Sequence, residues 1–168
     1  DSLVDSIIDE KLSSQTDAAS RTSLEGLRGK VAIANAKLAY QHYRALCAGD
    51  RWQALAKKGA QVQRLLWAST GVKNPDYRDV LYVEQLIGAD TVNTMPIATF
   101  EAFRDHGVAV ATIEQDVDDA RRVMAAAEAA GISMKQVTDK LQADAVQLFV
   151  EPFDKLLAAI ERQCQSTR

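Results

Sequence analysis

The stretch RLLWASTGVKNP, residues 64–75, decides how this chain is expected to fold and where it is expected to bind a ligand. Its apolar residues predict a strand over residues 63–69, and that strand ends directly in Ser-Thr-Gly. The carboxyl end of such a strand presents hydroxyl and backbone N–H groups, and Lys73 adds a positive charge close by. The stretch therefore predicts an anion site, suited to a phosphate group, at Ser69, Thr70 and Lys73. The alternative is that Ser69 and Thr70 only terminate the strand.

A second strand is predicted further along the chain, in the stretch DTVNTMP at residues 90–96. Residues 91–95 are rich in β-branched side chains, and Pro96 stops the run. Between the two strands, residues 79–87 are amphipathic and end at Gly88, which predicts a crossover helix. A strand–helix–strand unit of this kind places its two strands parallel, and such a pair needs cover on both faces.

The rest of the chain is predicted to be mainly helical. Residues 1–12 carry apolar side chains at helical spacing, with Asp1 or Ser2 placed to cap the first turn. The polar segment 13–22 is predicted to be a loop, and a helix is predicted from Ser23 to Cys47. Further helices are predicted over 51–58, 97–105, 116–130, 133–141 and 143–164, with Gly59 as a left-handed cap and Pro152 placed to kink the last helix.

The composition fits one globular domain with a core. Of the 168 residues, 47% are hydrophobic and 26% are charged. A net charge of −3, without a basic run, argues against nucleic-acid binding. The sequence has no signal segment and no run of about 18 apolar residues, so we expect a cytoplasmic protein without a membrane span. Cys47 and Cys164 have no metal-ligand or CxxC spacing and are expected to be free.

Two strands are too few to close an α/β sheet, because both would leave an unpaired edge. The missing strands are expected either upstream of Asp1 or from a second chain. The first residue is an Asp rather than a Met, and a helix is predicted to start there at once. We therefore expect the chain to be a piece of a longer protein.

Both strand motifs resemble the bacterial transaldolase family. The resemblance rests on the strings WASTGVKNP and TVNTMP, on Tyr82-Val83-Glu84 and on the helix segment 29–40, which occur in the family's order and separation. It is strongest over residues 24–106. In the helical tail, Phe149 and Phe153 still fit the family's C-terminal helix.

The resemblance implies an α/β fold, namely the helix-rich C-terminal portion of a (β/α)8 TIM barrel. Residues 1–168 would be that part, with 63–69 as the seventh strand and 91–95 as the eighth. It also implies an enzyme that transfers a dihydroxyacetone unit between sugar phosphates, sedoheptulose 7-phosphate and glyceraldehyde 3-phosphate, in the non-oxidative pentose phosphate pathway. The reaction runs through a lysine Schiff base and needs no cofactor.

The family's Schiff-base lysine lies on the fourth strand, and its acid–base carboxylates lie on the first and third. By resemblance, then, no catalytic residue is expected in this chain, which alone would be inactive. The N-terminal half of the barrel would be the partner that completes the site. The oligomeric state does not follow from the sequence.

The same resemblance assigns a phosphate-binding role to residues after the first predicted strand. Ser69 matches the family's phosphate-binding serine, and Lys73-Asn74 stands where many relatives carry a cation followed by Asn. Thr70 and the N–H of Gly71 are further candidate donors. Lys73 suits a phosphate as a point charge better than covalent catalysis, because it lies in a loop. The other eight lysines are expected on solvated helix surfaces.

Several other patterns have simpler explanations than a site. His42 and His106 stand at no catalytic spacing and are expected to be structural. The acids 116, 118 and 119 are expected to cap a helix rather than to bind a metal. Trp67 either lines the sugar site or packs under the helices, and Asn93 is expected to fill the barrel rather than to reach a substrate.

Two other interpretations of the function stay open at this point. One is a catalytically inert helical interaction module derived from a transaldolase, whose sign would be cooperative unfolding of the 168 residues alone. The other is one part of a fused transaldolase/glucose-6-phosphate isomerase, which the tail 158–168 neither supports nor excludes.

Overall fold

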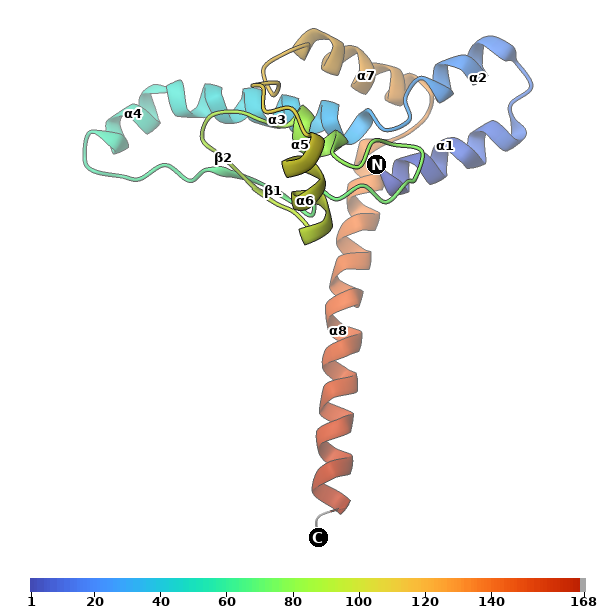
Figure 1. Ribbon diagram of the computed structural model, residues 1–168, viewed down its shortest axis with the longest axis vertical. Coiled ribbons are helices and arrows are strands. Elements are labelled where there is room, and N and C mark those ends of the chain that lie inside the picture. Colours follow the sequence, from blue (N-terminus) through green and yellow to red (C-terminus); the bar gives the residue numbers. More distant parts are fainter. Residues whose placement is uncertain (167–168) are drawn as a thin grey trace. The chain divides into compact units, whose positions relative to one another are not determined.

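The computed structural model describes residues 1–166 and divides into two units, residues 1–131 and the segment from Ile132 onward (Figure 1). The second unit holds α8, Met134–Ser166. In chain order the elements of the first unit are α1 (Ser2–Ser14), α2 (Ala18–Glu25), α3 (Val31–Ala48), α4 (Asp50–Ala56), β1 (Leu65–Ala68), α5 (Leu81–Gln85), β2 (Thr91–Thr94), α6 (Ile97–His106) and α7 (Val117–Ala129).

The two strands pair in parallel, as the sequence predicts. β1 and β2 are hydrogen-bonded side by side with Leu65 opposite Thr91 and Trp67 opposite Asn93. The connection between them contains the short helix α5. Each strand is four residues long and so shorter than predicted. β1 ends early because Ser69 turns into the left-handed region, with a φ of 55°.

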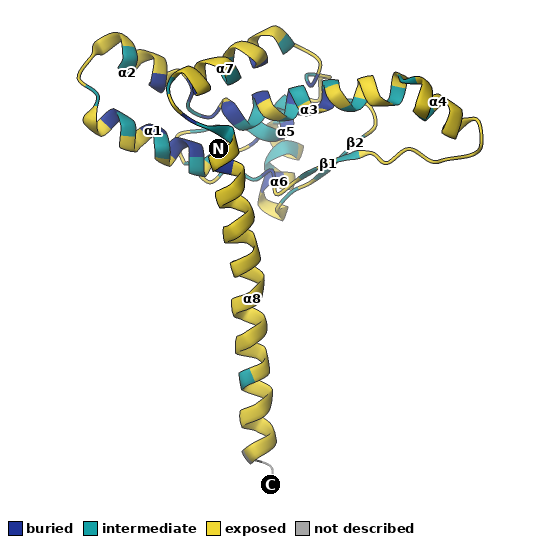
Figure 2. Ribbon diagram, turned by 180° about the vertical axis from the view of Figure 1, so that it is seen from behind, coloured by how far each residue is buried: buried dark blue, intermediate teal, exposed yellow. Residues whose placement is uncertain are grey.

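One face of β1 packs on helices. Tyr40 of α3, Leu86 and Ile113 form a buried cluster, and Leu65 and Trp67 pack against it. Trp67 therefore packs under the helices, and it also lines the cleft described below. The helix α3 also packs against α7. Figure 2 shows buried residues on both of these helices. On the opposite face of β1, in the part of the chain that the structure describes, Leu66 is 52% exposed.

The N-terminal helices differ from the prediction in two ways. The predicted loop over 13–22 is wrong, because α2 begins at Ala18. The side chain of Asp17 accepts a hydrogen bond from the Ser20 N–H (2.7 Å) and so starts this helix. The predicted helix from Ser23 to Cys47 is also wrong, since the chain breaks between α2 and α3. Gly29 has a φ of +66° there, which a helix does not allow.

Asp1 occupies the N-cap position of α1 but does not cap that helix with its side chain. Its Oδ1 instead accepts a hydrogen bond of 2.8 Å from the N–H of Ala32, at the start of α3. The predicted left-handed cap at Gly59 is confirmed by its φ of +89°, and α6 matches the helix predicted over 97–105 to within a residue.

α8 is one helix of 33 residues, so the prediction of two separate helices over 133–141 and 143–164 is wrong. The residues at the predicted break, Leu141-Gln142-Ala143, are all good helix formers without a glycine or a proline. Pro152 lies inside α8, and the helix continues through it. Among the described residues, no helix combines the length and the apolar character that crossing a membrane requires.

Candidate phosphate-binding cleft

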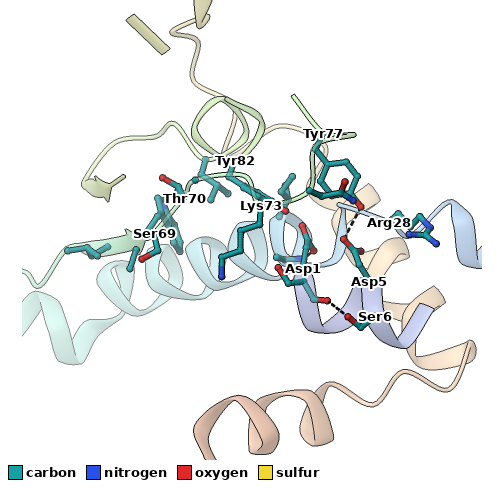
Figure 3. A pocket seen from close by; sticks show the side chains of 18 of the residues that line it. Asp1, Asp5, Ser6, Arg28, Ser69, Thr70, Lys73, Tyr77 and Tyr82 are labelled. Atoms are coloured by element: carbon teal, nitrogen blue, oxygen red, sulfur yellow. Dashed lines mark hydrogen bonds between the residues drawn. The ribbon is translucent and has the colours of Figure 1, made fainter. Parts of the chain in front are cut away.

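A cleft of about 540 Å³ lies at the carboxyl end of β1 (Figure 3). Its walls come from residues 66–71 with Lys73 and Asn74, from one side of α1, from Arg28 and the start of α3, and from Tyr77, Tyr82 and Leu86. All three residues that the sequence predicts as a phosphate site, Ser69, Thr70 and Lys73, line this cleft. The structure therefore brings them together, at the edge of the sheet where ligands bind in parallel α/β folds.

Ser69 is exposed and ends β1 in a left-handed conformation. A non-glycine residue in this region carries strain of about 1–2 kcal/mol, and such strain collects at functional sites. The side chains of Ser69 and Lys73 extend to the same side of the loop in Figure 3, and Lys73 lies between Ser69 and the start of α1. A hydroxyl donor and an ammonium group thus face one open space.

Thr70 is only 6% exposed. Its hydroxyl donates a hydrogen bond of 2.6 Å to the side-chain oxygen of Asn93, and its N–H donates to the carbonyl of Thr94 (3.4 Å). The Thr70 proton is therefore already used within the protein, where it ties the end of β1 to β2. Asn93, which the sequence marks as a barrel-filling residue, is the acceptor of this contact.

The loop after Thr70 lies close to the second motif. A Cβ atom added to Gly71 would lie 2.9 Å from Cγ of Pro96 and 3.2 Å from the hydroxyl of Thr99. Only glycine leaves room for this approach. The loop then turns at Asn74, whose side chain accepts a hydrogen bond from the Asp76 N–H (3.0 Å) and whose carbonyl accepts one from the Tyr77 N–H (3.2 Å).

A contact that the sequence analysis missed joins this loop to α1. The hydroxyl of Tyr77 donates a hydrogen bond of 2.8 Å to the carboxylate of Asp5, which is 8% exposed. The other oxygen of Asp5 accepts from the N–H of Gly29 (3.3 Å). Asp5 lies next to Val4 on the buried side of α1, and an acid in that position needs partners. The position of an acid on the apolar side of a predicted helix was the signal in the sequence that Asp5 has a buried partner.

Both tyrosines of the cleft stay neutral over the physiological range. Burial is the largest of the effects that raise the pKa of Tyr77 to about 12, and the hydrogen bond to Asp5 and the charge of Asp5 contribute to the same rise. Burial also raises the pKa of Tyr82 to about 12, with a smaller contribution from the charge of Asp5. Tyr77 therefore keeps the proton that it donates.

One lysine differs from the prediction. Lys37 of α3 is 5% exposed, and its Nζ donates a hydrogen bond of 3.1 Å to the carbonyl of Gln115. The expectation that it is solvated is wrong, because α3 packs against α7 on that side. Lys37 lines a separate cavity of about 360 Å³ and not the cleft that holds Ser69 and Lys73.

The two histidines lie outside the cleft walls. His106, at the end of α6, contacts Asp79 through Nε2 (2.9 Å) and Asp105 through Nδ1 (3.2 Å). Hydrogen bonds to these two carboxylates raise the pKa of His106. Within residues 1–166, no three His, Cys, Asp or Glu side chains stand together in a way that could hold a metal ion.

Comparisons with known proteins agree with the sequence motifs. A family model described as transaldolase/fructose-6-phosphate aldolase matches residues 4–160. A protein named transaldolase from Trichodesmium erythraeum is 44% identical over 165 residues, covering 97% of this chain and 43% of that protein. A transaldolase of Neisseria meningitidis serogroup C is 48% identical over 148 residues, covering 88% of this chain and 42% of that protein. Transaldolase 1 of Streptomyces coelicolor is 46% identical over 166 residues, 98% of this chain and 42% of its own length. The chain thus spans less than half the length of the curated relatives that it matches.

Proposed function

This chain belongs to the transaldolase/fructose-6-phosphate aldolase family, and from that membership we propose that its cleft holds the phosphate group of a sugar phosphate during a transaldolase reaction. The observation that carries this proposal is that Ser69 and Lys73 line one cleft at the carboxyl end of β1. A hydroxyl donor and a positive charge together match the oxygens and the charge of a phosphate.

The proposed reaction moves a dihydroxyacetone unit from sedoheptulose 7-phosphate to glyceraldehyde 3-phosphate. A lysine amine attacks the carbonyl carbon of the ketose, and loss of water gives a Schiff base. The bond between the third and fourth carbons of the ketose then breaks as the hydroxyl on the fourth carbon gives up its proton, which releases a four-carbon aldose phosphate and leaves an enamine on the lysine. The enamine that remains adds to the aldehyde carbon of the acceptor, and water then frees the lysine and the new ketose phosphate. No electrons are exchanged with a cofactor in this sequence.

The role proposed for the cleft is to anchor the end of the sugar that does not react. In both donor and acceptor the phosphate lies at the end of the chain away from the reacting carbonyl. This remote contact is made equally in the bound substrate and in the transition state, so it holds the substrate with the reacting carbon towards the lysine and acts on KM rather than on kcat. One anchor serves both half-reactions, because each substrate carries the same group.

We place the Schiff-base lysine outside residues 1–168, in the remainder of the barrel. A Schiff-base lysine must lose its proton readily and must reach the substrate. Lys37 is buried but lines a different cavity, and Lys73 lines the cleft but is exposed on a loop. The exposed face of β1 around Leu66 supports the same view, because parallel strands of this kind are covered on both faces. In this proposal residues 1–168 are the C-terminal part of the barrel, with β1 and β2 as its seventh and eighth strands.

The test uses the intact protein that contains this chain, with fructose 6-phosphate as the donor. Lys73→Met removes the charge and keeps the length of the side chain. We expect it to raise KM about tenfold or more and to leave kcat within about twofold, since a charge-assisted contact to the phosphate is lost. Lys57→Met is the matched control, because Lys57 is an exposed lysine at the end of α4 and lies outside the cleft walls. An unchanged KM in Lys73→Met would overturn the proposal.

A further inference from the structure

The candidate phosphate site sits on an irregular loop, residues 69–80, between β1 and α5. Such a loop orients a charge well only if it is fixed at both ends. Its first end is fixed to β2 by the hydrogen bonds of Thr70 to Asn93 and Thr94, and by the close approach of Gly71 to Pro96. Lys73 comes directly after this anchor, so its position also depends on what holds the far end.

Tyr77 is the point where the far end of the loop meets two other segments. Its hydroxyl binds Asp5 of α1 at 2.8 Å (Figure 3). Its ring lies against Gly29 in the turn between α2 and α3, where an added Cβ would lie 3.0 Å from Cζ of Tyr77. Gly29 in turn donates its N–H to Asp5. Three segments of the chain therefore converge on one phenol group, and Asp5 and Tyr77 are 72 residues apart in the sequence.

The contact also has an electrostatic consequence for an anion in the cleft. Asp5 itself lines the cleft, and its negative charge works against binding a phosphate. The Tyr77 hydroxyl and the Gly29 N–H both point their protons at this carboxylate and so offset part of its field. Without the phenol proton, the loop loses its anchor and the carboxylate loses a donor. Both changes weaken phosphate binding.

We infer that Tyr77 is a positioning residue of the phosphate site, which acts through its hydrogen bond to Asp5 by holding the Lys73 loop and by screening the Asp5 charge from the bound phosphate. This inference rests on the proposed function of the cleft. It assigns Tyr77 no contact with the reacting atoms, so its effect is confined to substrates that carry the phosphate.

The test is Tyr77→Phe in the intact protein, assayed with fructose 6-phosphate and with unphosphorylated fructose as alternative donors. We expect KM for fructose 6-phosphate to rise about fivefold to tenfold with kcat within about twofold, because one hydrogen bond to a charged group is lost. We also expect the inhibition constant of inorganic phosphate to rise by a similar factor. The value of kcat/KM for fructose should stay unchanged. Asp5→Asn should raise both constants less than Tyr77→Phe does, because it weakens the contact to Tyr77 but also removes the negative charge that opposes the phosphate.

Tyr40→Phe is the matched control for a purely structural effect. Tyr40 is fully buried and also loses one hydroxyl hydrogen bond, to the carbonyl of Ala89 (3.1 Å), but it lies in the core cluster rather than in the cleft wall. It should lower the melting temperature without changing KM for fructose 6-phosphate. An equal loss of kcat/KM for both donors in Tyr77→Phe, or no loss for either, would overturn the inference.

The failure of this inference can be separated from that of the proposed function. If Lys73→Met raises KM for fructose 6-phosphate and Tyr77→Phe does not, the phosphate site stands and the positioning role is wrong. If Lys73→Met has no effect either, the phosphate site itself is wrong.

Discussion

The hydroxyl of Thr70 and the side-chain oxygen of Asn93 lie 2.6 Å apart and join the carboxyl ends of the two strands. Thr70 comes directly after the strained residue Ser69, so this contact helps to hold Ser69 in its left-handed conformation. The two motifs that dominate the sequence, around residues 64–75 and 90–96, therefore meet at the carboxyl ends of the strands, where this hydrogen bond acts together with the one from the Thr70 N–H to the carbonyl of Thr94.

Thr70→Val tests the strength of this contact. Valine has the same shape but no hydroxyl, so the oxygen of Asn93 loses its donor while the packing is kept. We expect the free energy of unfolding to fall by about 1–2 kcal/mol, measured by urea denaturation of the intact protein. Thr22→Val is the control, because the Thr22 hydroxyl donates a hydrogen bond to the carbonyl of Ala18 on an exposed helix face. Equal losses in the two variants would mean that the Thr70–Asn93 contact adds no more stability than an exposed hydrogen bond within a helix.

The proposed position of the Schiff-base lysine predicts where a trapped substrate is found. The intact protein is incubated with fructose 6-phosphate and borohydride, which reduces a Schiff base to a stable adduct, and is then digested for mass spectrometry. We expect the adduct on a lysine outside residues 1–168. The same treatment of the 168-residue chain alone should leave its mass unchanged. An adduct on Lys73 or on Lys37 would contradict the assignment.

The contact between His106 and Asp79 predicts a pH dependence. Hydrogen bonds to Asp79 and Asp105 raise the pKa of His106 above its usual 6.5, so its contribution to stability is complete below about pH 6.5 and is lost as the pH rises through the folded-state pKa. The hydrogen bond from His106 lowers the pKa of Asp79 below 3.8, so the Asp79 contribution is present above about pH 3.8 and is lost as the pH falls through its lowered pKa. Both groups are exposed, so the stabilisation is small.

An NMR titration of the His106 ring in the intact protein checks this. We expect the pKa of His106 to fall toward 6.5 in Asp79→Asn, because the carboxylate with the largest effect on His106 loses its charge. Asp119→Asn removes the same charge on α7, where the side chain contacts Arg122 instead, and should leave the pKa of His106 unchanged. If the pKa of His106 is the same in wild type and in Asp79→Asn, the contact does not persist in solution.

The features that the sequence predicts well are those with local causes. The strands and their parallel pairing follow from two short β-branched or apolar runs, each stopped by Gly or Pro, on either side of a helical segment. The three predicted residues of the cleft follow from the end of one strand. Whether they bind phosphate stays a prediction.

The features that it misses depend on residues far apart in the chain. The break at Gly29 depends on Tyr77, whose ring fills the space where a side chain would be. The Asp5–Tyr77 contact spans 72 residues, and no local pattern gives the partner. Lys37 did carry a local signal, since it lies on the same side of α3 as Val31 and Ala34, but its place beside Gln115 depends on the docking of the 107–116 segment.

Gly71→Ala is the sharpest test of how closely the loop must lie against β2 and α6. The new Cβ would lie 2.9 Å from Cγ of Pro96, which is a part of a rigid ring, so the loop has to move away. We expect a loss of about 1–3 kcal/mol in the free energy of unfolding and, because Lys73 lies two residues further on, a higher KM for fructose 6-phosphate with little change for unphosphorylated fructose. Gly49→Ala is the control, since Gly49 has an ordinary φ of −70° and its added Cβ would meet the Leu46 carbonyl at 3.3 Å. The Gly49→Ala variant should keep the wild-type KM for both donors. If the Gly71→Ala protein keeps wild-type stability and wild-type KM, the loop does not need this close approach to hold the phosphate.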